Sequence, residues 1–202
     1  LFNYIKFFTM LKLIISYLNI FRLFPHIFFY FFYMKNINSD IKRCKEHHLD
    51  IDFIGINGLL YFLTFDKSFR ALFYYRIGIM SNLFSFLAPT YSNLLINSHC
   101  RIGEAALLVH SFSTIINPES IGSDFRISNY CIKKKKKGGR PIIKDNVTIH
   151  PGSIIFGPII IGNNVVIGAG SVVSKSIPDN CIVIGNPAYI IKIDGKKVFQ
   201  RL

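Results

Sequence analysis

The feature that most constrains the fold of this chain is a six-residue period in its C-terminal half. Aliphatic residues stand at six positions, each six residues after the last, and a small or β-branched residue follows four places later; the aliphatic set is Ile143, Ile149, Ile155, Ile161, Ile167 and Val173. The same spacing occurs upstream at Ile102 and Leu108 and, after one extra residue, at Ile115, Ile121 and Ile127. A period of six matches neither a helix nor a simple alternating strand, so the segment is a structural repeat.

Three such hexads form one triangular coil, and successive coils stack at the strand spacing of about 4.8 Å. Residues 18 positions apart then pack on each other, as Ile143 on Ile161 and Ile149 on Ile167. Glycine follows the aliphatic residue at Gly162, and we expect it there because it tolerates the backbone bend at a corner. The pattern predicts a mainly β protein, a left-handed parallel β-helix of hexapeptide repeats preceded by an α-helical N-terminal region.

Changes in period and composition predict the organisation of the chain. We expect a hydrophobic helical N-terminal segment at 1–50, a helical region at 51–90, the β-helix domain at 91–192 and a C-terminal tail at 193–202. The interval from Ile127 to Ile143 exceeds two hexads by four residues. That excess predicts a loop extruded from a corner at 133–141, where a rigid scaffold would carry function.

The first 34 residues leave three interpretations open. The apolar window from Leu13 to Tyr33 is long enough to span a bilayer but contains Arg22, Pro25 and His26. The segment therefore forms a spanning helix, a buried helix of an N-terminal domain, or a peripheral membrane contact through residues 1–34 in which basic residues meet anionic lipid. No small-residue cleavage site of a signal peptide is visible.

Charge and cysteine content narrow the functional classes. The formal net charge of +13 suggests an anionic partner such as a phosphorylated cofactor or a membrane surface. No nucleic-acid-binding module can be read in the sequence, so we expect no nucleic-acid partner, and the run Lys133 to Lys137 is interpreted as a solvated loop. The four cysteines are widely spaced without a CxxC pair, which indicates neither a metal site nor disulfides and favours a cytoplasmic protein.

Three segments together resemble the hexapeptide-repeat acyltransferases. They are the hexads, the surroundings of His110, and the ending from Gly185 to Lys192; the stretch from Ile167 to Lys175 is especially typical. Within these enzymes the chain is most similar, over about residues 69–192, to the serine acetyltransferase group, particularly its members from surface-polysaccharide gene clusters. The resemblance implies an acetyl-CoA-dependent O-acetyltransferase that works as a homotrimer with active sites between neighbouring prisms.

The resemblance also implies roles for particular residues. His110 occupies the position of the catalytic histidine, which acts as general base and takes the proton of the acceptor hydroxyl; an imidazole suits that task near neutral pH. His99 and His150 lie beside turns and are interpreted as ordinary corner residues. For acetyl-CoA, the family pattern implies contacts at positions on the C-terminal coils, namely Pro151, Gly152, Ala169, Gly170, Ser174, Lys175 and Lys192. No metal is implied.

The chain departs from the serine acetyltransferase pattern at three positions. Val109 and Leu95 stand where the family carries aspartates near the catalytic histidine, and Arg140 replaces a second histidine. The acceptor therefore stays open between L-serine and a sugar hydroxyl of a surface polysaccharide. A second hypothesis, motivated by the missing carboxylates, is a catalytically inactive β-helix that serves as a scaffold or binding module.

Overall fold

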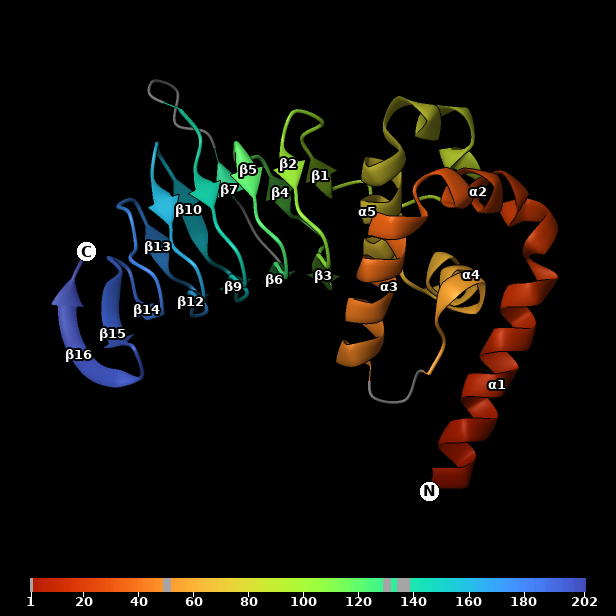
Figure 1. Ribbon diagram of the computed structural model, residues 1–202, viewed down its shortest axis with the longest axis horizontal. Helices are drawn as coiled ribbons and strands as arrows, with labels where there is room; N and C mark the ends of the chain where they lie inside the picture. Colours follow the sequence, from red (N-terminus) through yellow and green to blue (C-terminus); the bar gives the residue numbers. More distant parts are fainter. Residues whose placement is uncertain (1, 49–51, 129–131, 134–138) are drawn as a thin grey trace. The chain divides into compact units, whose positions relative to one another are not determined.

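The computed structural model describes residues 2–48, 52–128, 132–133 and 139–202. Contacts divide the chain into two compact units, a helical unit from Leu1 to Thr90 and a solenoid unit from Tyr91 to Leu202. Each unit has its own set of buried apolar side chains. Figure 1 shows the helices and strands of the two units.

Over residues 2–48 and 52–90 the helical unit contains five α-helices and two short 3₁₀-helices (Figure 1): α1 Phe2–Leu18, α2 Ile20–Phe32, α3 Met34–His47, α4 Gly55–Phe65, α5 Lys67–Ile77, η1 Gly78–Leu83 and η2 Ser85–Leu87. Helix α4 contacts α1, α2, α3 and α5, and its residues from Gly58 to Leu63 are buried. Asp66 caps α5 by accepting hydrogen bonds from the backbone N–H groups of Ser68 and Phe69, which would otherwise lack partners.

Buried polar groups tie these helices together. The guanidinium of Arg70 donates to the backbone oxygens of Leu63 and Thr64, carbonyls that the end of α4 leaves unsatisfied, and to that of Pro89. Arg76 of α5 forms a two-pronged ion pair with Asp40 of α3, at 2.9 and 3.0 Å. These contacts fix α4 and α5 against α3 and the end of the unit.

No single helix in the described ranges is long and apolar enough to cross a bilayer. The pair Phe8–Leu18 and Ile20–Phe32 reaches the required length and composition together, but its two halves meet at 85°. Part of this pair belongs to the core of the unit, since Leu23, His26 and Tyr30 of α2 are buried.

The solenoid unit consists of short strands that form three sheets (Figure 1): β1 Leu95–Ile96, β2 Arg101–Ile102, β3 Leu107–Val109, β4 Ile115–Ile116, β5 Ser120–Ile121, β6 Arg126–Ser128, β7 Ile132–Lys133, β8 Ile142–Ile143, β9 Thr148–Ile149, β10 Ile154–Phe156, β11 Ile160–Ile161, β12 Val166–Ile167, β13 Val172–Val173, β14 Cys181–Ile184, β15 Tyr189–Ile193 and β16 Lys196–Arg201. We call the sheets A (β1-β4-β7-β10-β13), B (β11-β8-β5-β2) and C (β16-β15-β14-β12-β9-β6-β3). Every pairing is parallel except those of β15, which folds back as the centre of a C-terminal antiparallel extension.

The predicted stacking of coils is confirmed. Ile143 pairs with Ile161 and Ile149 with Ile167, and all four side chains are buried in the interior of the prism. Chain order visits sheets A, B and C in turn, so each coil up to β12 contributes one strand to each side, and the last coil reaches side B through an isolated bridge of Ile177 to Ile161. A three-sided parallel β-helix preceded by helices is therefore the architecture of the chain.

Two details of the register differ from the sequence interpretation. Ile116, rather than Ile115, points into the prism, because β4 pairs Ile116 with Ile132 and leaves Ile115 half-buried on the outer side. The break after Leu108 therefore adds two residues instead of one, and Ile121 follows Ile116 after five positions instead of six. Hexad counting missed this because two isoleucines stand side by side.

Gly162 has a different purpose from the one expected for it. A Cβ on Gly162 would lie 2.6 Å from the backbone nitrogen of Asp179 in the next coil, so glycine is required by close stacking and not by a left-handed backbone. The left-handed positions at this corner are taken by Asn146 and Asn164, with φ near +55°, and in the earlier coils by Ala105 and Asp124. The asparagine amides form a ladder in which Asn146 donates to Asn164 and Asn164 to Asn180, at 2.9 and 2.8 Å.

Candidate functional site

His110 is the residue that directly follows β3, and its backbone turns sharply there. Its φ of +47° lies in the left-handed region, which a non-glycine residue seldom adopts and which is often found at functional sites. The N–H of Phe112 donates to the carbonyl of His110 at 2.9 Å and closes the turn. The side chain of His110 is exposed at the corner between sheets C and A.

Four of the predicted acetyl-CoA contacts lie at this same corner. Leu108, Ile127, Ile149 and Ile167 form one interior column of sheet C. His110, Pro151 and Ala169 each follow a member of this column by two residues, namely Leu108, Ile149 and Ile167. These three residues therefore lie along the same edge of the corner. At a coil spacing of about 4.8 Å, three steps separate His110 from Ala169 by about 14 Å.

The corner beside His110 is lined with small residues. Gly152 and Gly170 adopt φ of +78° and +69°, and Gly170 donates its N–H to the carbonyl of Pro151 at 2.9 Å. A Cβ on Gly152 would lie 3.4 Å from the nitrogen of Gly170, whereas one on Gly170 would meet nothing within 4 Å. The surface is thus flat and open outwards, which suits an extended ligand lying along the stacked turns.

Buried hydroxyls make these turns rigid, a feature that the sequence interpretation recorded only as small residues. The hydroxyl oxygen of Ser153 lies 2.8 and 2.9 Å from the carbonyl oxygens of His150 and Gly168, and its single proton is shared between these two acceptors. Ser171 is also bonded to the carbonyl of Gly168, and it accepts from the N–H of Gly185. Gly185 continues the edge of Pro151 and Ala169 by one coil, but the shorter spacing from Ile167 to Val183 concealed its place in the sequence.

The remaining predicted contacts lie elsewhere in the chain. Ser174 and Lys175 follow β13 and are exposed at the next corner, between sheets A and B. Lys192 is half-buried in β15, opposite Ile182 on one side and Lys197 on the other. A single prism therefore brings Pro151, Gly152, Ala169 and Gly170 to the edge of His110, but not these three residues.

Other histidines, and the extruded loop, complete the surroundings. His150 is half-buried and lies one residue before the corner edge, whereas His99 is exposed at the corner between sheets A and B. Of the predicted loop 133–141, residues 134–138 lie outside the described residues. Arg140 is half-buried at the end of the loop. Burial raises the pKa of Cys100 to about 11, and the positive charge of Arg140 partly offsets this rise. The raised pKa keeps the thiol protonated at neutral pH.

No carboxylate among the described residues of one chain hydrogen-bonds the imidazole of His110. Val109, which precedes it, pairs in register with Ser128, and Leu95 is exposed on the outer side of sheet A. In the same described ranges no group of three or more His, Cys, Asp or Glu side chains could hold a metal ion. The local chemistry is that of a single imidazole beside a flat polypeptide corner.

Comparison with known proteins gives this geometry a family. Residues 140–175 match the family model described as bacterial transferase hexapeptide (six repeats). The chain is 33% identical over 178 residues to a serine acetyltransferase of Staphylococcus epidermidis, a match that covers 82% of both proteins. The chain belongs to the serine acetyltransferase family. The predicted resemblance to hexapeptide-repeat acyltransferases of the serine acetyltransferase type is therefore confirmed.

Other serine acetyltransferases extend the comparison. The enzyme of Synechococcus elongatus is 30% identical over 137 residues, which is 63% of this chain but only 54% of that protein. The crystal structure of the Neisseria gonorrhoeae serine acetyltransferase matches with a TM-score of 0.66 and 26% identity, covering 82% of this chain and 67% of that one. A structure of the same bacterium's enzyme in complex with serine matches with a TM-score of 0.58 and 27% identity, over 77% and 68% of the two chains. The left-handed β-helix preceded by helices is the fold that this family shares.

Proposed function

We propose that this chain transfers the acetyl group of acetyl-CoA to the hydroxyl group of L-serine, with His110 as the general base. The observation that carries the proposal is the position of His110 on the same corner edge as Pro151 and Ala169, in a member of the serine acetyltransferase family. The exposed imidazole and the flat, small-residue edge supply a base and a surface for an extended cosubstrate.

The reaction follows from the chemistry of these groups. The imidazole of His110 accepts the proton of the serine hydroxyl while the oxygen attacks the thioester carbonyl. As the tetrahedral intermediate collapses, the carbon–sulfur bond breaks and the protonated imidazole returns its proton to the departing thiolate. The products are the O-acetyl ester of serine and free CoA. A positioned base of this kind contributes roughly 10²–10⁴ in rate.

The acetyl-CoA site is proposed to begin at the His110 corner and to include Pro151, Gly152, Ala169 and Gly170. Small side chains there let the pantetheine arm lie against the stacked turns. Ser174, Lys175 and Lys192 are proposed to complete the site, with the two lysines near the phosphates. Because one prism holds these three residues away from the His110 corner, the complete site requires a neighbouring copy of the chain.

The outer face of sheet A supports a homotrimer of prisms. Its outward column is aliphatic in each described coil: Leu95 and Ile154 are 58% and 38% exposed, and Ile115 and Val172 are half-buried. Such a column is suited to pack against another copy of the chain, and a closed ring is the usual outcome of repeated identical contacts. We propose that three copies associate through it.

The proposal also names L-serine as the acceptor and the cytoplasm as the compartment. The matched proteins named above are serine acetyltransferases, and this favours L-serine over the sugar hydroxyl that the sequence left open. The described cysteines Cys44, Cys100 and Cys181 are buried and form no disulfide with one another, as expected for a protein of the reducing cytoplasm.

The test is an assay of free-thiol release from acetyl-CoA by the full chain, with L-serine and a panel of sugars as acceptors. We expect turnover with L-serine and a loss of about a hundredfold to ten-thousandfold in kcat for His110→Ala, with acetyl-CoA binding retained in calorimetry. The matched control is His99→Ala, also an exposed corner histidine, which should stay within about twofold of the parent chain.

Three results would contradict the proposal. Retained activity in His110→Ala would remove the assigned base. Turnover with a sugar but not with L-serine would reassign the acceptor. A chain that binds no acetyl-CoA at high micromolar concentration would instead be the inactive scaffold or binding module.

A further inference from the structure

Helix α2 carries its polar atoms inside and its largest apolar side chains outside. The buried side holds His26, whose Nε2 lies 2.7 Å from the hydroxyl of Tyr74, and Tyr30, whose hydroxyl donates to Asn38 at 2.8 Å. His26 also packs edge-on against Phe84. This face is thus packed inside the helical unit, and the helix cannot rotate about its axis without breaking these bonds.

The outer side of α2 is a surface of phenylalanines, here called the phenylalanine face: Phe21, Phe24, Phe28, Phe31 and Phe32. Each of the five is more than half exposed, and Phe21 reaches 92%. At 100° per residue they fall within an arc of about 100°. A core-facing surface helix has the opposite arrangement, so this face is suited to contact something other than water.

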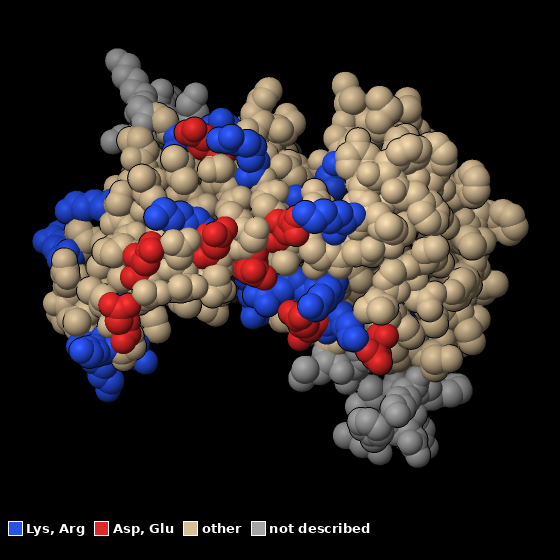
Figure 2. Space-filling model, viewed as in Figure 1, with Lys and Arg blue, Asp and Glu red and all other residues tan. Residues whose placement is uncertain are grey.

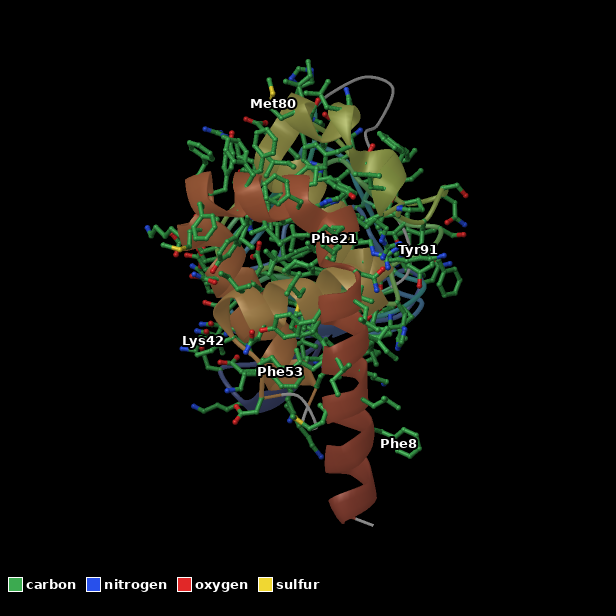
Figure 3. The ribbon with its side chains drawn as sticks, turned by 90° about the vertical axis from the view of Figure 1, so that its right-hand side faces the viewer. Phe8, Phe21, Lys42, Phe53, Met80 and Tyr91 are labelled. Carbon is green, nitrogen blue, oxygen red and sulfur yellow. The ribbon has the colours of Figure 1, made fainter. Side chains whose placement is uncertain are left out.

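The exposed apolar surface continues beyond α2. The ring of Phe84 stacks on Phe29, which places the 3₁₀ segments beside the helix, and there Leu83 and Phe86 are 70% and 73% exposed. In Figure 3 Phe8 points away from α1, and Phe21 lies near the junction of α1 and α2. Figure 2 shows charged side chains at the lower left of the visible face of the helical unit and almost none over the rest of that face.

The charges of the N-terminal segment indicate the occupant of this face. Residues 1–39 contain no Asp or Glu, whereas Lys12, Arg22 and Lys35 are exposed. A second copy docked through the same helices would bring cations toward cations without an acidic group from either segment. An anionic lipid surface, in contrast, offers an apolar layer for the rings and phosphates for the basic side chains.

We propose that the phenylalanine face of α2 lies in the interface of a membrane that contains anionic lipid. The rings enter the boundary between headgroups and acyl chains, and Arg22 and Lys12 contact the headgroup phosphates. The helix lies in the plane of the surface and does not cross the bilayer. This contact is separate from the acetyl-transfer site and rests on residues that the catalytic proposal does not use.

Flotation of the full chain with lipid vesicles tests the proposal. We expect it to float with vesicles of phosphatidylcholine and phosphatidylserine, more weakly with phosphatidylcholine alone, and less as salt rises from about 0.1 to about 0.5 M. Phe21→Ser combined with Phe24→Ser should lower the vesicle-bound fraction about tenfold or more, because two exposed rings no longer leave water. Arg22→Ser should weaken binding only to the anionic vesicles.

Phe199→Ser is the matched control, since Phe199 is 81% exposed on β16 of the solenoid unit. Both phenylalanine variants should keep the parent's circular dichroism and acetyl transfer. Equal flotation of the parent chain and the α2 double variant would overturn the proposal, as would failure of the parent chain to bind either vesicle. Self-association without lipid that disappears in the double variant would overturn it in favour of a second copy of the chain.

Discussion

The helical unit and the solenoid unit solve the problem of a stable core in different ways. Among the described residues, the buried polar groups of the solenoid are hydroxyls alone: Ser111, Thr114, Ser153 and Ser171. The helical unit instead buries charge, with Asp40 and Arg70 in its interior. The comparison teaches that repetition stabilises one unit through many equivalent contacts, whereas the other depends on a few specific ones.

The largest effect on stability is expected when Asp40 of the helical unit is replaced. Asp40→Ala leaves the buried guanidinium of Arg76 without its carboxylate, and we expect a loss of about 3–5 kcal/mol in the free energy of unfolding. Urea unfolding followed by circular dichroism of the helices measures it. Asp40→Leu combined with Arg76→Leu should cost less than the single change; if the pair costs as much as the two single changes summed, the ion pair is not a unit.

Acid should weaken the helical unit before the solenoid. Burial, with help from the charges of Arg22 and Arg70, lowers the pKa of His26 from 6.5 to about 4. As the pH falls below about 6.5, His26 binds a proton in the unfolded chain but not in the folded chain. The contribution of His26 to the free energy of unfolding is therefore fully present above about pH 6.5 and is lost as the pH drops toward 4. The full difference corresponds to about 3 kcal/mol.

Urea unfolding at pH 7 and pH 5 measures this effect of acid. In His26→Gln the part of the pH dependence that comes from His26 should disappear, whereas the exposed His99→Gln should behave as the parent chain does. A parent chain and a His26→Gln variant with the same slope of stability against pH would show that His26 titrates normally in the folded state.

Two glycines of the solenoid sharpen the comparison at the smallest scale. In Gly162→Ala the new Cβ meets the backbone of the next coil, and we expect overpacking to cost about 1–3 kcal/mol. In Gly170→Ala the Cβ points into open space, so only the positive φ costs about 1 kcal/mol, while the Km for acetyl-CoA rises. Thermal melting and kinetics separate the two; equal melting temperatures would contradict the stacking role of Gly162.

The two units also differ in how far they could be predicted. The hexads predicted the paired residues of the coils, because one interior position per strand repeats along the chain. They did not separate Ile115 from Ile116, since both are isoleucine and only the pairing of β4 with β7 decides which one turns inward. In the helical unit the pattern predicted helices but not the partners of Asp40 or His26, which lie 36 and 48 residues away in the chain.

For the candidate site, the sequence predicted His110 and the small residues of the coils, but not which of them share an edge. Which residues share an edge depends on the number of residues in each coil. This number varies where a loop is inserted, and each inserted residue changes the position around the prism of every residue that follows.

The amino-acid sequence by itself determined the repeat and hence the β-helix. A six-residue period buries all of its aliphatic positions when three hexads form one three-sided coil and the coils stack. The tertiary structure alone decided which side chains face outwards together. Pro151 and Ala169 join His110 at one corner, Lys175 lies at another, and α2 presents its phenylalanines to the outside. These groups of side chains form through stacking and packing between segments that are distant in the sequence. A local periodic pattern does not report such contacts.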